Sequence, residues 1–253
     1  MQNKDNKRSK LFVSTCTFFI TGLVLIALWN VFLAEEIKRS GIEREGLKKD
    51  IKKIEALEKA NMNFKKDVLR QKAISLCFFE LIKEYEEIYT NKEKQDCIQF
   101  IGMIDEKYRH KGLDAPLILA WLEKESDGNP RAVSYAGAKG LTQLMDFRAE
   151  EILAAMGYSG YQKKLVFNPV INLAGGLHHL VALMNFWEMN AIKNRSLILF
   201  YALHSYKWGT KNTVQLFNSE RRAFRPAIEY VNWILNRREN WVEKLKSRMN
   251  NAQ

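Results

Sequence analysis

Cysteine is scarce in this chain of 253 residues, which contains only Cys16, Cys77 and Cys97. No two of them form a CxxC pair, so the sequence gives no support to a zinc site of the usual spacing. Cys16 lies in an apolar run and is interpreted as a packing residue. Cys77 and Cys97 lie in helical patterns and could pair in an oxidising compartment, and the sequence leaves their pairing open.

Proline is also scarce, and all four prolines come after residue 115. Residues 35–95 contain none, whereas Pro116, Pro130, Pro169 and Pro226 punctuate the later part of the chain. This change in composition predicts a compact domain over residues 96–253.

Stretches with a regular strand alternation are missing as well, and the apolar spacing is helical almost throughout. Asp114 is a plausible N-cap for one of these helices, with Pro116 in its first turn. The fold class that the sequence predicts is all-α. The helices expected in the later part of the chain are 97–108, 115–126, 138–157, 168–187, 195–209 and 225–249.

The first long apolar run covers residues 11–34 and carries no charged side chain. A helix of this length spans a hydrocarbon core of about 30 Å. We therefore expect a single N-terminal transmembrane helix over 11–34, preceded by a tail at 1–10. A cleaved signal peptide is the alternative, but its apolar region is normally shorter.

Residues 35–95 are dense in Lys and Glu, and Leu47, Ile51, Ile54 and Leu57 follow one another at helical spacing. We interpret 35–95 as a helical stalk or linker with a solvated face. A short coiled coil is the sharper alternative, although the heptads are few and irregular.

Positive charge dominates, with a formal net charge of +11. Such a surface favours anionic partners. No nucleic-acid motif accompanies the basic C-terminal segment, so nucleic acid is not expected. His178 and His179 are adjacent on a predicted helix and point about 100° apart, so with His204 they do not suggest a metal site.

The stretch WLEKESDGNPRAVSYAGAKGLTQLM, residues 121–145, holds the candidate chemistry. Glu123 and Glu125 lie roughly 200° apart on the predicted helix, so one can be buried while the other is solvated. A carboxyl beside apolar groups has a raised pKa, which suits a general acid. From this stretch alone, the preferred interpretation is that both glutamates are solvated charges at a helix end. The glycines that follow permit a tight turn, and Gln143 is expected on the next helix.

These residues resemble a known signature. The pattern ES…NPRAVSYAGAKGLTQLM is similar to that of the soluble lytic transglycosylase domain, which is related to goose-type lysozymes. Three further blocks follow in the order of that family: NPVINLAGGLHHL at 168–180, YKWG at 206–209 and EYVNWIL at 229–235. Together the blocks cover about residues 97–240.

The resemblance implies a lysozyme-like α-helical domain and a peptidoglycan lytic transglycosylase. Such an enzyme cleaves the β-1,4 bond between N-acetylmuramic acid and N-acetylglucosamine, forms a 1,6-anhydro product and needs neither cofactor nor metal. Glu125 would be the catalytic acid and base, and Ser134, Gln143, Met145 and Tyr206 would bind the substrate. The substrate lies outside the cell, so the resemblance also implies an inner-membrane anchor, a cytoplasmic 1–10 and an extracytoplasmic or periplasmic domain.

Several positions depart from the family pattern. Thr142 stands where the family often has Met, Asp146 where it usually has Pro, Lys207 where it has Asn, and His179 where it often has Tyr. Asp146 is interpreted as an exposed acid in the first turn of a helix, and a second catalytic carboxylate is the alternative.

One alternative is a goose-type-lysozyme-like hydrolase of the same bond, because the placement of a water molecule is not fixed by the sequence. The other, suggested by the altered YKWG block, is a catalytically weak wall-binding scaffold in a secretion or division complex. The partner expected for the enzyme is a secretion, conjugation or division complex. Glu125 speaks against the scaffold, because a pure binding protein has no need of the acid.

Overall fold

A computed structural model describes residues 29–32, 34, 44–155, 157, 163–190, 192, 194–218 and 225–251. The chain divides into two compact units, Met1–Asn63 and Phe64–Gln253, and each is described by itself. Apart from 29–32 and 34, the predicted membrane span lies outside the described residues, as does the predicted tail. Within the part that is described, no helix combines the length and apolar character needed to cross a bilayer.

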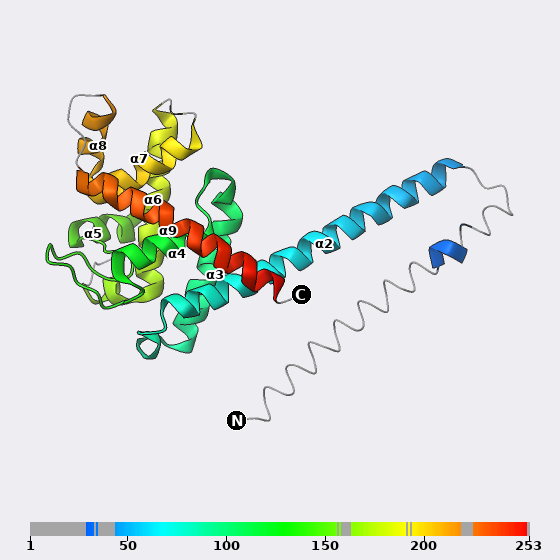
Figure 1. The fold of residues 1–253 in the computed structure, drawn as a ribbon, viewed down its shortest axis with the longest axis horizontal. Coiled ribbons are helices and arrows are strands. Elements are labelled where there is room, and N and C mark those ends of the chain that lie inside the picture. The colour runs from blue at the N-terminus through cyan, green and yellow to red at the C-terminus, as the bar shows by residue number, and fades with distance from the viewer. Residues whose placement is uncertain are drawn as a thin grey trace. The chain divides into compact units, whose positions relative to one another are not determined.

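The all-α expectation is confirmed for the described residues, which form helices and no β-strand (Figure 1). Two isolated bridges, Val133 to Lys139 and Lys139 to Leu144, are the β-type pairings among them. The α-helices are α2 (Arg44–Leu81), α3 (Asn91–Tyr108), α4 (Ala115–Ser126), α5 (Asp146–Ala155), α6 (Pro169–Met189), α7 (Arg195–Trp208), α8 (Thr210–Phe217) and α9 (Arg225–Asn250). Three short 3-10 turns, η1 (Glu86–Ile88), η2 (Arg109–Lys111) and η3 (Lys163–Phe167), connect them.

The helix α4 forms the centre of the second unit. All eight residues from Ala115 to Leu122 are buried, so this helix is apolar on every side, as expected of a core helix. The Asp114 carboxylate accepts a hydrogen bond from the Leu117 N–H at 3.0 Å, which confirms the predicted cap. The helix lies alongside α9 (Figure 1). Its buried body carries the C-terminal turn, with Glu125, into the interior of the unit.

The last turns of α2 belong to the same core. Ala73, Ile74, Cys77, Phe78 and Leu81 recur at helical spacing and are at most 6% exposed. Hydrophobic contacts of this kind stabilise the fold in proportion to the buried area. The compact unit Phe64–Gln253 therefore includes the last turns of α2 in its core.

A buried ion pair fastens α2 to the beginning of α4. Arg70 on α2 donates two hydrogen bonds, of 2.6 and 2.7 Å, to the carboxylate of Asp105 on α3. Asp105 is 2% exposed and also accepts a hydrogen bond from the Ala115 N–H at 2.8 Å. A buried charge needs such partners, and here they come from two helices, α2 and α4.

Cys77 and Cys97 are both free and buried. Burial raises the pKa of each thiol, so both are protonated at neutral pH and behave as small apolar residues.

The helix expected over 138–157 begins only at Asp146, so the prediction was wrong for its first part. Residues 138–145 form a tight loop in which Gly140 and Gln143 have positive φ angles of 76° and 52°. A Cβ at Gly140 would lie 2.3 Å from the Asn172 Nδ2 atom, so only glycine fits there. Because the loop packs closely against α6 at Gly140, its backbone forms a turn and not a helix. Gln143 therefore lies in this loop and not on the expected helix. The short helix α8 was not expected from the sequence.

Candidate active site

Glu125 lies in the last turn of α4, partly buried among aromatic side chains. The hydroxyl of Tyr230 on α9 donates a hydrogen bond to its Oε1 atom. Burial raises the pKa of the Glu125 carboxyl to about 7, although the Tyr230 hydrogen bond and the positive charge of Lys207 act in the opposite direction. The carboxyl is therefore available in both protonation states near neutral pH, as a group that acts first as an acid and then as a base requires.

Three aromatic residues surround this carboxyl. The Trp121 Nε1–H donates to the Tyr230 hydroxyl oxygen at 3.1 Å, which leaves the Tyr230 proton directed at Glu125. The rings of Trp121 and Tyr206 meet edge to face with centroids 5.0 Å apart. Burial and the nearby Glu125 raise the pKa of both tyrosines well above their ordinary value, so their hydroxyls stay protonated and act as donors.

Glu123, two residues earlier, lies on a different face of α4. The Arg237 guanidinium donates hydrogen bonds of 2.6 to 2.9 Å to its carboxylate, and the Trp241 Nε1–H donates to it at 2.8 Å. This carboxylate is held by a cation and an indole, so it is a structural ion pair between α4 and α9.

The loop of residues 138–145 is fastened beside Glu125 from two sides. The Tyr206 hydroxyl donates to the Thr142 carbonyl at 2.7 Å, and the Ser126 hydroxyl donates to the Leu141 carbonyl at 2.9 Å. One contact comes from α7 and the other from the residue next to Glu125. Tyr206 therefore positions the loop with its hydroxyl while its ring contacts Trp121.

Asn172 of α6 holds the loop from the interior of the unit, and it is 1% exposed. Its Oδ1 atom accepts from the N–H of Thr142 at 2.8 Å and from the Thr142 hydroxyl at 2.7 Å. Its Nδ2 atom donates to the carbonyls of Lys139, at 2.9 Å, and Val166, at 2.8 Å. A Cβ at Gly176 would lie 2.4 Å from the Thr142 hydroxyl oxygen, so glycine lets α6 approach the loop. Thr142, one of the departures from the family pattern, thus has a buried hydrogen-bond partner.

The predicted substrate-binding residues fall into two groups. Tyr206 touches Trp121 and the loop, next to Glu125. Ser134 and Gln143 use polar atoms on the loop itself: the Ser134 hydroxyl oxygen accepts from the Ala138 N–H at 3.0 Å, and the Gln143 amide donates to the Gly140 carbonyl at 2.9 Å. Met145 is partly buried and immediately precedes α5. Neither a hydrogen bond nor an ion pair links Glu125 to these last three residues.

Two lysines flank the carboxyl from the solvent side. Lys207 is exposed and its ammonium lies 5.4 Å from the centroid of the Tyr230 ring. Lys124 is also exposed and lies 4.8 Å from the centroid of the Trp233 ring. Asp146, the candidate second carboxylate, forms an ion pair with Lys139 at 2.5 Å.

His179 and His204 pack against neighbouring side chains. The His179 ring lies 5.4 Å from that of Tyr206, and burial lowers the pKa of His179 to about 4, so it is neutral at neutral pH. His204 pairs through Nδ1 with the Thr213 hydroxyl at 2.9 Å. Within the described ranges, no three His, Cys, Asp or Glu side chains gather as they would around a metal ion.

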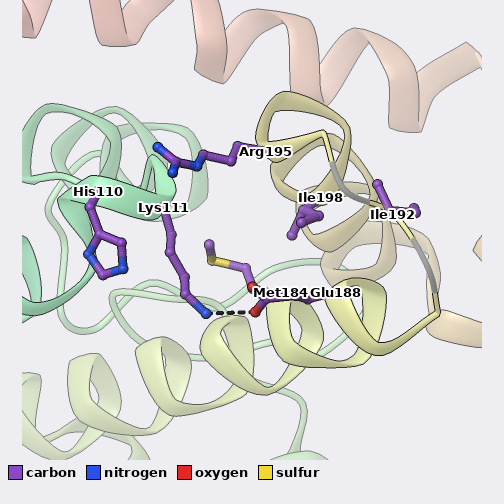
Figure 2. Close-up of a pocket in the computed structure, with 7 residues that line it drawn as sticks. All are labelled: His110, Lys111, Met184, Glu188, Ile192, Arg195 and Ile198. Carbon is purple, nitrogen blue, oxygen red and sulfur yellow. Dashed lines mark hydrogen bonds and ion pairs between the residues drawn. The ribbon is translucent and has the colours of Figure 1, made fainter.

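A pocket of about 420 Å³ lies elsewhere in the unit, between η2, the end of α6 and the beginning of α7. Figure 2 shows Arg195 reaching across it toward His110 and Lys111, and the ion pair between Lys111 and Glu188, which measures 2.6 Å. Arg195 is eleven residues before Tyr206 on α7, a distance of about 16 Å along the helix. The carboxylate in this pocket is that of Glu188, and it is paired with Lys111. The pocket is therefore not a second candidate site for acid–base chemistry.

Sequence reasoning assigned no role to Tyr230 or Asn172. Both lie in blocks that carry the resemblance, EYVNWIL and NPVINLAGGLHHL, and that position was the available signal. What the sequence could not show is that Tyr230 contacts Glu125 across 105 residues of chain.

Comparisons with known proteins find relatives for part of this chain. The membrane-bound lytic murein transglycosylase C of Salmonella arizonae is 30% identical over 125 residues, which are 49% of this chain and 34% of that protein. The protein of the same name from Mannheimia succiniciproducens is 29% identical over 136 residues, 53% of this chain and 37% of that one. The chain therefore matches only about a third of the length of these relatives.

Two solved structures are also similar to this chain, each at 22% identity. An inactive mutant of the lytic transglycosylase Slt from Pseudomonas aeruginosa has a TM-score of 0.46 and covers 56% of this chain and 23% of its own. The 70 kDa soluble lytic transglycosylase of Escherichia coli has a TM-score of 0.42 and covers 50% of this chain and 21% of its own.

The model of the family described as the transglycosylase SLT domain matches residues 102–228. This range is half of the chain and contains Glu125, the loop of residues 138–145, Asn172 and Tyr206. The chain belongs to the family of proteins with a transglycosylase SLT domain.

Proposed function

We propose that this protein is a peptidoglycan lytic transglycosylase in which Glu125 is the only catalytic carboxyl. The observation that carries the proposal is a protonatable carboxyl at the end of a buried helix. It is surrounded by Trp121, Tyr206 and Tyr230, and its pKa is raised to about 7. Such a group can give up a proton and take one back at neutral pH.

In the first step, Glu125 donates its proton to the glycosidic oxygen between the two sugars, and the bond from this oxygen to the anomeric carbon of N-acetylmuramic acid breaks. Positive charge develops at the anomeric carbon, where the substrate's own N-acetyl group can stabilise it. The Tyr230 hydroxyl donates to the Glu125 carboxylate, so it stabilises the negative charge left on the acid.

In the second step, the Glu125 carboxylate takes the proton of the sugar's 6-hydroxyl while the oxygen of this hydroxyl bonds to the anomeric carbon. The 1,6-anhydro ring closes, Glu125 is protonated again and no water is consumed. One carboxyl therefore suffices for the whole cycle.

Hydrolysis of the same bond would need a water molecule, usually held by a second carboxylate. Lys207 and Lys124 act on Glu125 as positive charges. Asp146, the candidate for the second carboxylate, is paired with Lys139. These contacts favour transglycosylation over hydrolysis.

Substrate binding is assigned to the loop of residues 138–145 and to its neighbours. In this proposal Ser134, Gln143, Met145 and Tyr206 line the glycan groove. The hydrogen bonds of Ser134 and Gln143 hold the loop in shape, so both residues act partly through the backbone that they position. No cofactor or metal takes part in the proposed chemistry.

For the whole chain, we propose that residues 11–34 anchor the protein in the cell membrane and that 35–253 lie on the side of the wall. The stalk would comprise 35–95 and the lysozyme-like domain 96–253, with the end of α2 contributing to the core. The relatives whose names call them membrane-bound support the anchor.

The orientation is tested with a C-terminal fusion to a reporter that is active only outside the cytoplasm. We expect the fusion to be active, and a cytoplasmic C-terminus would contradict the proposed orientation. The partner complex would be one of secretion, conjugation or division.

The experiment that tests the proposed function incubates the purified full chain with peptidoglycan and analyses the released muropeptides by mass spectrometry. Products lighter by one water than the reducing-end muropeptides are expected, and they should be missing for a folded Glu125→Gln variant. Reducing-end products would show a hydrolase instead. If the folded wild type releases no product, a wall-binding scaffold becomes the better hypothesis.

A further inference from the structure

Lys207 is placed where it can meet a substrate. It occupies the last turn of α7, directly after Tyr206, and its side chain is exposed. Its ammonium lies over the ring of Tyr230, 5.4 Å from the centroid, and the hydroxyl of that ring donates to Glu125. Lys207 thus stands on the solvent side of the catalytic carboxyl.

Two arginines of α9 that face α4 have carboxylate partners. Arg237 holds Glu123, and Arg238 holds Asp114, with contacts of 2.6 and 2.7 Å. No described residue forms an ion pair with Lys207. Its contact is with the face of an aromatic ring, which leaves the ammonium free to donate to an incoming acceptor.

The position of Lys207 is costly for an enzyme that needs a protonated acid. A nearby cation favours the ionised carboxylate, so Lys207 opposes the effect of burial on Glu125. An anionic group of the substrate that paired with Lys207 would cancel this field while the substrate is bound. Lys207 would then bind the substrate and let Glu125 gain its proton at the same time.

We propose that Lys207 binds a carboxylate of the substrate, on the sugar or the peptide next to the bond that Glu125 cleaves. This inference rests on the proposed function. The carboxylate has two possible sources: the lactyl group of N-acetylmuramic acid where the peptide has been removed, or the attached peptide itself. Both offer the same chemistry to an ammonium, a charge-assisted hydrogen bond.

The groups that face Glu125 come from three helices, and they define the controls. Lys124 is on α4, Tyr206 and Lys207 are on α7, and Tyr230 is on α9. The two tyrosines are donors that stay protonated. Lys124 is the other cation, and it lies over Trp233 rather than over Tyr230.

The binding test uses the full chain with Glu125→Gln, so that no turnover occurs, and titrates three soluble oligosaccharides in a calorimeter. These are a neutral oligomer of N-acetylglucosamine, a peptide-free glycan with free lactyl carboxylates, and a peptide-bearing glycan. Adding Lys207→Asn, which restores the family residue, should weaken binding of an anionic glycan about tenfold and leave the neutral oligomer unchanged. Lys207→Arg should retain binding, and Lys211→Asn, which removes an exposed charge on α8, should change little.

The anionic glycan whose binding is weakened by Lys207→Asn identifies the source of the carboxylate. An equal loss on the neutral oligomer, or no loss on either anionic glycan, would overturn the proposal. This experiment needs no catalysis, so its result is separate from that of the muropeptide assay. If the assay fails and the charge-dependent binding holds, the proposed reaction is wrong and Lys207 remains a carboxylate-binding residue.

A kinetic test follows with the active enzyme. The pH profile of kcat/KM reports the free enzyme and that of kcat reports the complex. For the wild type, kcat should fall at a higher pH than kcat/KM, because the bound carboxylate cancels the Lys207 charge. In Lys207→Asn the fall of kcat/KM should move to higher pH and the gap between the two profiles should narrow. Profiles identical to those of the wild type would count against Lys207.

Discussion

The two faces at the end of α4 carry the same side chain in opposite settings. On the Glu123 face, the carboxylate is gripped by Arg237 and Trp241. On the Glu125 face, a carboxyl two residues later lies among Trp121, Tyr206 and Tyr230, and its pKa is raised to about 7. The residue type is identical, so the partners from α7 and α9 decide which glutamate holds the fold together and which is free to exchange a proton.

Neutralising each glutamate in turn should give the largest difference between the two faces. Glu125→Gln should lower kcat by about 10³-fold or more, since the proposed acid and base are lost together. Glu123→Gln keeps an acceptor for Arg237 and should retain most of the activity per folded molecule. Muropeptide release by the two variants, measured beside their circular dichroism spectra, checks this. Comparable losses of activity in both variants would contradict the assignment of Glu125.

The second prediction concerns how the free energy of unfolding depends on pH, which should reveal the raised pKa of Glu125. Because the Glu125 pKa is raised from 4.5 to about 7 in the folded state, the folded protein binds more protons at this carboxyl than the unfolded chain does between these values. The contribution of this carboxyl to the free energy of unfolding should fall as pH rises through the window, by up to about 3 kcal/mol. His179, whose pKa is lowered to about 4, acts in the opposite direction in both proteins. The expected result is therefore that the free energy of unfolding of the wild type falls relative to that of Glu125→Gln as pH rises.

Urea unfolding at several pH values between 5 and 8 provides the measurement. Glu243→Gln, at an exposed position of α9, serves as the control and should follow the wild type. If the curve of Glu125→Gln runs parallel to that of the wild type, Glu125 has no raised pKa in the folded state.

Removal of the Glu123 side chain should act on stability. Glu123→Ala leaves the Arg237 guanidinium and the Trp241 N–H without their shared acceptor, which costs about 2 kcal/mol. The expected sign is a lower urea midpoint at an unchanged m-value. Glu243→Ala breaks an exposed pair with Lys246 and should stay within about 0.5 kcal/mol of the wild type. An equally small effect at Glu123 would mean that its ion pair is not structural.

Tyr230→Phe is the mildest change on the Glu125 face. It removes one hydrogen bond to the carboxylate and should lower kcat about tenfold. The Tyr230 hydrogen bond lowers the Glu125 pKa, so its loss should move the fall of activity to higher pH. Steady-state kinetics across pH measure both effects, with Tyr108→Phe on α3 as the control. An unchanged rate and profile would remove Tyr230 from the proposed mechanism.

The sequence predicted those features that depend on near neighbours in the chain. The helix 115–126 was expected with its present bounds, because Asp114, Pro116 and an unbroken apolar run all act within a few residues. The candidate role of Glu125 came from the family pattern around it. The loop of residues 138–145 was read as helix, since its apolar spacing is helical and the contact that bends it comes from Asn172.

The sequence by itself determined the all-helical character of the second unit, the limits of its central helix and the family to which the chain belongs. These follow from periodicity, capping residues and motifs, which are local properties. The tertiary structure decided that α2 completes the core, that the loop is held by α6 and that Glu125, not Glu123, meets Tyr230. These depend on contacts between residues far apart in the chain, because burial and hydrogen bonding are set by whatever element packs against a side chain.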